Sequence, residues 1–321
     1  MAPNAVLAPI APRTPIAPGA SNAPAVAVLA ATTGAHVAPR VPASPDAPLA
    51  SDASETTLAD AHDMLMLGQY DEAAKVYAAL TADPRQATAA SIGLARCWIQ
   101  TGRYDDAITA LHDARAPDNA DWHAALAAVL TRTGRYEDVL RHAESAVRLD
   151  PGHTDARLVL GRTLELLGRR DEAIATYRWF DRQIAGRPEL PRDAVWITNT
   201  AVGFLRYSVL TRTNVTRRVK HVLEEMLQVA YERLDRSWWP ARIAAADLLR
   251  ERFNNDEHDG SVSDYKAALR INGNLPEAHV GLGEVALDAW DFDEVERRAA
   301  LALGINPNFS PAIRLLAKNL L

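Results

Sequence analysis

The chain has 321 residues, of which 48% are hydrophobic and 24% charged, so it can bury a large core. Its 35 basic and 41 acidic residues leave a formal net charge of −6, which gives no general basic field, and we expect no nucleic-acid partner. A single cysteine, Cys97, excludes an internal disulfide and a cysteine-based zinc site. Cys97 falls on the buried side of a predicted helix, where we expect it to act as a small core hydrophobe.

Residues 1–55 differ in composition from the rest of the chain. They hold ten of the nineteen prolines and no Phe, Trp or Tyr, and the first of these three residue types in the chain is Tyr70. Such a segment cannot bury enough apolar area to offset its chain entropy, so we predict a disordered Ala/Pro-rich leader. Its longest weakly polar run, 25–35, is too short to span a membrane and lacks the basic cluster that opens a signal peptide. We therefore expect no membrane span and a cytoplasmic location, with export left open.

From Thr57 onward the apolar residues recur at a helical period and predict four pairs of helices. Each second helix starts with acidic residues, which complement the positive end of the helix dipole. The predicted helices cover 58–67 and 71–82, 87–101 and 104–114, 121–133 and 136–149, and 155–167 and 171–184. Intervals of 34, 32 and 34 residues separate the glycines at the turns, Gly68, Gly102, Gly134 and Gly168. Self-similarity at this period predicts a solenoid of helix pairs.

The repeat register fails between residues 186 and 238. Two helices of about 20 residues each are predicted there, over 191–211 and 215–236, without the glycine turn. We interpret this segment as a stretched repeat with a solvated basic face, and the alternative is an insert that shapes a binding surface. Four tryptophans bracket it, and we expect them to pack in the core: Trp179, Trp196, Trp238 and Trp239.

The helical repeat pattern resumes at Trp239. It predicts helices over 239–253, 259–271, 276–288, 291–303 and 310–321. The stretches 268–278 and 302–312 align at a separation of 34 residues, which indicates one repeat unit. The predicted organisation is therefore a leader (1–55), N-terminal repeats (56–185), an irregular longer helical pair (186–238), and C-terminal repeats with a terminal helix (239–321).

Certain residue types recur at fixed places in the helix pairs. A leucine precedes a small residue in the first helix, glycine and tyrosine form the turn, and alanine and an aromatic residue follow in the second helix. Repeat one supplies Gly68, Tyr70, Ala73 and Tyr77, repeat three Leu126, Gly134, Tyr136, Ala146 and Pro151, and repeat four Leu160, Gly161, Gly168, Ala173 and Tyr177. A late repeat supplies Leu282, Gly283, Phe292, Ala302 and Pro307.

This register resembles that of the tetratricopeptide repeat (TPR) family. Two positions depart from the family pattern, because Arg170 replaces the turn tyrosine and Trp290 replaces the turn glycine. The resemblance implies an all-α, right-handed superhelical solenoid of antiparallel helix pairs. Small residues within the helices permit the close helix packing that such a fold needs.

The resemblance also implies that the first helices of the pairs line a concave groove. The family's groove positions fall in this chain on Arg96, Gln100, Arg132, Arg162 and Glu165. Their net sign in repeats two to four is positive, so we expect a protein or peptide partner of acidic character. The asparagine and lysine positions with which some family members clamp a peptide C-terminus hold other residues here, which disfavours that mode: Gly93, Ala125 and Val159.

The sequence contains no catalytic constellation. It lacks an H-E-x-x-H helix and a P-loop, and its histidines are scattered, so we expect no enzyme activity, no metal site and no cofactor. We predict a non-enzymatic scaffold that binds a protein segment in the groove. One alternative is the repeat-bearing, substrate-recruiting part of a larger hydrolase or transferase whose catalytic domain is not in this chain. Another is self-assembly through exposed end repeats.

Overall fold

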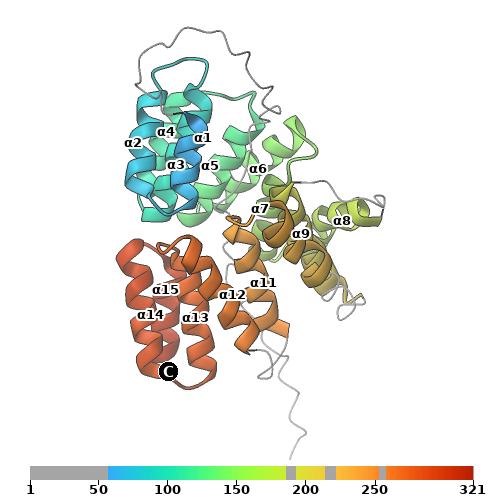
Figure 1. The fold of residues 1–321 in the computed structure, drawn as a ribbon. Helices are drawn as coiled ribbons and strands as arrows, with labels where there is room; N and C mark the ends of the chain where they lie inside the picture. The colour runs from blue at the N-terminus through green and yellow to red at the C-terminus, as the bar shows by residue number, and fades with distance from the viewer. Residues whose placement is uncertain (1–56, 186–192, 214–221, 253–257, 321) are drawn as a thin grey trace, which may run out of the picture.

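The computed structural model describes residues 57–185, 193–213, 222–252 and 258–320, and every regular element in these ranges is a helix. Successive helices lie antiparallel in pairs, and the pairs stack side by side (Figure 1). The chain is therefore the predicted all-α, TPR-like solenoid. The predicted leader, 1–55, lies outside the described residues.

Helices α1 to α8 form four successive pairs, each joined by a short turn. Their bounds are Leu58–Met66 (α1), Tyr70–Leu80 (α2), Ala87–Thr101 (α3), Tyr104–Ala114 (α4), Ala120–Arg132 (α5), Tyr136–Leu149 (α6), Thr154–Leu166 (α7) and Arg170–Ala185 (α8). The predicted bounds are confirmed to within two residues at every end.

Local chemistry explains where these helices begin and end. At the start of α1, Thr57 and Asp60 form a capping box, in which the Asp60 N–H donates to Thr57 Oγ1 (3.2 Å) and the Thr57 N–H donates to Asp60 Oδ2 (2.7 Å). Asn119 caps α5 by accepting from the Trp122 N–H (2.9 Å). The turns between paired helices need a left-handed residue, and Gly102 supplies it with φ of 80°.

The irregular segment contains α9 (Ala194–Thr211) and two π-helical stretches, η1 (Val222–Leu227) and η2 (Ala230–Leu234). The predicted first helix begins later than expected, because Asp193 caps α9, and Pro191 lies outside the described residues. The second helix does not keep regular α geometry. Its π turns, with hydrogen bonds from residue i to i+5, place closely spaced side chains in the core, namely Val222, Met226, Leu227 and Ala230.

Two further helix pairs and a single helix complete the solenoid. Their bounds are Trp239–Arg252 (α11), His258–Ile271 (α12), Pro276–Asp288 (α13), Phe292–Ile305 (α14) and Ser310–Asn319 (α15). The turn before α14 carries Trp290 where the turns of the first four pairs carry glycine. Trp290 adopts the left-handed conformation (φ 60°), and 78% of its surface is exposed.

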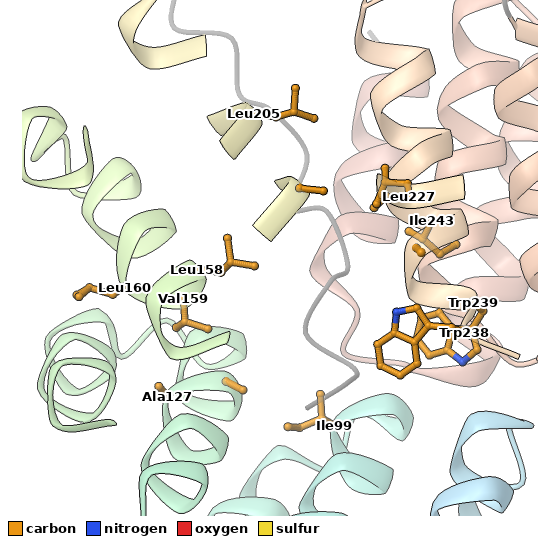
Figure 2. Packing of buried hydrophobic residues seen from close by; sticks show 14 of the residues in the cluster. Ile99, Ala127, Leu158, Val159, Leu160, Leu205, Leu227, Trp238, Trp239 and Ile243 are labelled. Atoms are coloured by element: carbon orange, nitrogen blue, oxygen red, sulfur yellow. The ribbon is translucent and has the colours of Figure 1, made fainter. Parts of the chain in front are cut away.

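The hydrophobic core is elongated, as expected for a stack of repeats. One apolar cluster continues from the N-terminal pairs through α7 and α9 to α11 and α13, and Figure 2 shows part of it around Leu158, Val159 and Trp239. Trp238 and Trp239 are buried, which confirms their predicted packing role. Cys97 is 1% exposed and is a core residue, as predicted.

The two ends of the described solenoid meet. Figure 1 shows α1 to α4 directly above α13 to α15. The hydroxyl of Tyr70 donates to the backbone oxygen of Asn274 (2.8 Å), and Asn308 Nδ2 donates to the backbone oxygen of Gly102 (3.0 Å). The superhelix therefore closes on itself, which the periodicity of the sequence did not predict.

Within the described ranges, the helices are too short or too polar for any of them to cross a lipid bilayer.

Candidate binding surface

The first helices of the pairs form the inner layer of the solenoid. They contact one another in series from α1 through α3, α5, α7, α9, α11 and α13 to α15, whereas the second helices pack against the first helices of neighbouring pairs. Because the inner arc of a curved stack is the shorter one, the helices in this series line the concave face. The predicted site residues all lie on three of these helices: Arg96 and Gln100 on α3, Arg132 on α5, and Arg162 and Glu165 on α7.

Arg96 lies in an acidic environment. Its half-buried guanidinium is in the electrostatic field of Asp121 on α5 and Asp155 on α7. His153 Nε2 lies 3.0 Å from Asp121 Oδ1, and His153 Nδ1 accepts from the Ala156 N–H (3.3 Å). Because Nδ1 is the acceptor, the Nε2–H group donates to Asp121. The positive charge predicted at Arg96 therefore faces the acidic side chains of the next two repeats.

Asp155 is the most perturbed carboxylate of this group. It is 5% exposed, and its Oδ1 accepts a hydrogen bond from Asn199 Nδ2 on α9 (2.6 Å). Its Oδ2 is buried and has no hydrogen-bond partner among the described residues. Burial raises the pKa of Asp155 to about 7, although the charges of His153 and Arg96 act in the opposite direction. Asp155 therefore takes up a proton near neutral pH.

Arg162 and Glu165 are brought together on α7. Glu165 Oε1 accepts hydrogen bonds from the Tyr177 hydroxyl (2.8 Å) and from Arg206 Nε (3.2 Å). Arg162 is half-buried in the field of Tyr177, Arg206 and Glu165. Burial raises the pKa of Tyr177 far above its ordinary value, so its hydroxyl remains a neutral donor. Glu165 is thus held in one orientation by two donors from neighbouring helices.

Arg132 is placed differently, at the end of α5 next to the C-terminal repeats. Its Nη2 lies 3.7 Å from Glu277 Oε1 on α13, and its Cζ lies 5.6 Å from the centroid of the Phe309 ring. A separation of 3.7 Å is too long for a hydrogen bond. The side chain is 13% exposed, and no described residue hydrogen-bonds to its guanidinium. Arg132 is therefore ion-paired with Glu277 without a short hydrogen bond between the two groups.

Sequence reasoning missed the acidic partners of these arginines. Asp121, Asp155 and Glu277 each lie in the first turn of a first helix, where a carboxylate is expected to complement the helix dipole. Their recurrence at one repeat position, with Asp121 and Asp155 separated by 34 residues, is the signal that could have identified them. Gln100, which was predicted as a groove residue, is only 4% exposed.

Comparison with known proteins identifies repeats of one type. A family model for the tetratricopeptide repeat matches residues 64–129 and 130–178. A thermophilic TPR protein of Thermus thermophilus is 22% identical, with 63% of this chain and 100% of that chain covered and a TM-score of 0.46. A TPR protein of Parabacteroides merdae is 15% identical, with 82% of this chain and 97% of that chain covered and a TM-score of 0.47. No curated protein matches the chain.

The stretch that the family model matches contains the regular helix pairs described above. It includes the left-handed turns at Gly68, Gly102, Gly134 and Gly168, whose φ angles lie between 74° and 80°. The aromatic and small residues of the repeat pattern also meet as the pattern requires, because the Tyr177 ring packs directly on Gly161. Residues 64–178 therefore consist of tetratricopeptide repeats.

Proposed function

We propose that the chain binds an acidic protein segment on its concave face, with Arg96, Arg132 and Arg162 as anchors and Gln100 and Glu165 beside them. A TPR protein is a protein–protein interaction scaffold, and the inner face of such a solenoid is an extended concave surface suited to a polypeptide. The placement of these five residues on α3, α5 and α7 supports the proposal, because these helices belong to the inner series.

The observation that carries the proposal is the state of Arg132. Its side chain is largely desolvated and its guanidinium is oriented by the Phe309 ring, yet the nearest described carboxylate is beyond hydrogen-bonding distance. An oriented, poorly hydrated guanidinium presents a fork of donors that matches a carboxylate. An aspartate or glutamate of a partner would form the short, charge-assisted bonds that Glu277 does not form.

Capture of partners from a lysate of the source organism tests the proposal. The full chain serves as bait beside a variant in which alanine replaces Arg96, Arg132 and Arg162. A control variant replaces three exposed arginines, Arg135, Arg169 and Arg297, whose side chains are 54%, 41% and 56% exposed. Both variants lose the same formal charge, so a general electrostatic effect would appear in both.

We call the chain with alanine at Arg96, Arg132 and Arg162 the concave-face variant. We expect wild type and the control variant to capture a partner that the concave-face variant does not capture. Circular dichroism should show equal helicity for all three. A partner retained equally by all baits would overturn the assignment of the concave face. Because half-buried arginines contribute to packing, Arg132→Lys provides a milder test. Lysine keeps the charge but loses the planar fork, so the retained amount should fall without loss of folding.

A further inference from the structure

Two turns near the N-terminus and two loops near the C-terminus form the contact that closes the solenoid. The turns are 68–70 and 102–104, each with the pattern Gly-x-Tyr, and the loops are 272–274 and 306–308, each with the pattern Asn-x-Asn. We call these four segments the clasp. Each turn contacts one loop, so the clasp consists of two equivalent halves.

The first half of the clasp joins turn 68–70 to loop 272–274. Asn272 Nδ2 donates to the Tyr70 hydroxyl (3.1 Å), and that hydroxyl donates to the backbone oxygen of Asn274 (2.8 Å). Asn274 Nδ2 donates to the backbone oxygen of Gly68 (3.0 Å). The loop is held in shape by its own bond from the Asn274 N–H to Asn272 Oδ1 (2.9 Å). Asn272 is fully buried as a result.

The second half repeats this pattern one repeat later. Asn306 Nδ2 lies 3.2 Å from the Tyr104 hydroxyl, and that hydroxyl lies 3.3 Å from the backbone oxygen of Asn308. Asn308 Nδ2 donates to the backbone oxygen of Gly102 (3.0 Å). Both the turns and the loops are offset by 34 residues, so each turn meets the loop 204 positions further along the chain. The two halves of the clasp therefore keep the 34-residue offset of the repeat.

The turn glycines fit the clasp by shape as well as by conformation. A Cβ atom on Gly68 would lie 2.2 Å from Asn272 Oδ1, and one on Gly102 would lie 2.4 Å from Asn306 Oδ1. The next two turn glycines, Gly134 and Gly168, share the left-handed conformation, but a Cβ atom there would have no described neighbour within 4 Å. The clasp therefore uses two of four otherwise similar turns.

Closure also brings a concave-face arginine against the opposite end of the solenoid. Arg132 approaches Glu277 and Phe309, which follow the two loops of the clasp in the chain. The carboxylate of Glu277 is buried and held 3.7 Å from the guanidinium, and its Oε2 has no hydrogen-bond partner among the described residues. The Glu277 carboxylate thus lies where a partner carboxylate would bind Arg132, but it does not form the short hydrogen bonds that a bound carboxylate would form.

We propose that the clasp is a reversible closure and that Glu277 occupies the place of a partner carboxylate at Arg132, so that partner binding and clasp opening are coupled. The proposal rests on the proposed function of the concave face. The hydrogen bonds of the clasp are mostly between neutral groups, and each such bond contributes little to stability once its exchange with water is counted. A partner that binds only the open form can therefore shift the equilibrium.

The turn glycines provide a matched pair of variants. Gly68→Ala with Gly102→Ala places two methyl groups against Asn272 and Asn306, whereas Gly134→Ala with Gly168→Ala imposes the same left-handed strain where nothing is touched. Small-angle X-ray scattering of the full chain measures closure directly. We expect a larger radius of gyration for the first variant than for the second, at equal helicity. Equal radii of gyration for the two variants would show that the clasp does not close the solenoid.

Partner capture then tests the coupling. Loss of the clasp bonds should raise the amount of captured partner by at least about threefold relative to the control pair, because the cost of opening is removed. An increased radius with unchanged or reduced capture would overturn the coupling while leaving the clasp in place. If the concave-face alanine variant captures as much partner as the wild type, the proposed function fails, and the scattering result still decides whether the clasp exists.

Discussion

Replacing Asp155 with asparagine should increase the stability of the protein at alkaline pH. The increase should be much smaller at acid pH. Burial raises the pKa of Asp155 from 3.8 to about 7 in the folded state. For an acid with a raised folded-state pKa, the folded state holds its proton over a pH range in which the unfolded chain has already lost it. Stability from this group is therefore fully present below about pH 3.8 and is lost as the pH rises to about 7.

The size of the effect follows from the two pKa values. Between pH 5 and pH 7 the folded state binds about one proton more than the unfolded state at this site, and above pH 7 the difference disappears. At about 1.36 kcal/mol per pH unit, the loss of stability between pH 5 and pH 8 is roughly 2–3 kcal/mol. Asparagine has no such titration and can still accept the hydrogen bond from Asn199, so the variant avoids this loss.

Urea unfolding at pH 5 and pH 8, for wild type and Asp155→Asn, measures the difference. The free energy of unfolding of the variant minus that of wild type should be larger at pH 8 than at pH 5, by roughly 2–3 kcal/mol. Asp118→Asn, at an exposed loop position, is the control and should give the same difference at both pH values. A pH-independent effect of Asp155→Asn would show that Asp155 is ionised throughout this range and would refute the reasoning.

Three further predictions concern single positions. Gly161→Ala should destabilise the protein by about 1–3 kcal/mol, because the added Cβ would lie 2.5 Å from the Tyr177 ring. Gly304→Ala, with no described neighbour within 4 Å, should stabilise it by up to about 1 kcal/mol. Urea unfolding measures both changes. Trp290→Gly should raise the thermal midpoint, because it relieves about 1–2 kcal/mol of left-handed strain at a side chain that is mostly exposed; a lower midpoint would show that Trp290 is held by packing. Cys97 should react with iodoacetamide at least about 100-fold more slowly in the native protein than in urea, because burial raises its pKa to about 12; equal rates would contradict its burial.

Local structure was predictable because each helix pair carries its own signals. Turn glycines, acidic first turns and apolar residues at helical spacing act within about ten residues of one another, so the bounds of α3, α4 and α6 follow from the sequence alone. Trp290 was noted as a departure from the repeat pattern, and the structure shows that the turn keeps its left-handed shape despite the substitution.

Contacts between distant repeats were not predictable in the same way. The Asn-x-Asn loops resemble ordinary polar connections, and nothing in their spacing shows that they face a turn 204 residues earlier. The curvature of the solenoid decides that contact, and curvature sums small rotations at every repeat. The buried acids were missed for a related reason, because Asp155 resembles a helix-start residue until α9 is seen to bury it.

The π turns of the irregular segment were also not predictable from periodicity. A helix with buried residues at Val222, Met226, Leu227 and Ala230 is compatible with more than one helical geometry. η1 packs against α9 and α11, and the sequence period carries no information about these contacts.

Hydrogen–deuterium exchange of the full chain, with and without the partner recovered by capture, tests the concave-face assignment most directly. Backbone amides that a bound segment stabilises should exchange more slowly. We predict slower exchange in α3, α5 and α7, together with a change at the loops 272–274 and 306–308 of the clasp. Slower exchange confined to the outer helices α4, α6 and α8 would contradict the assignment and place the binding surface on the convex face.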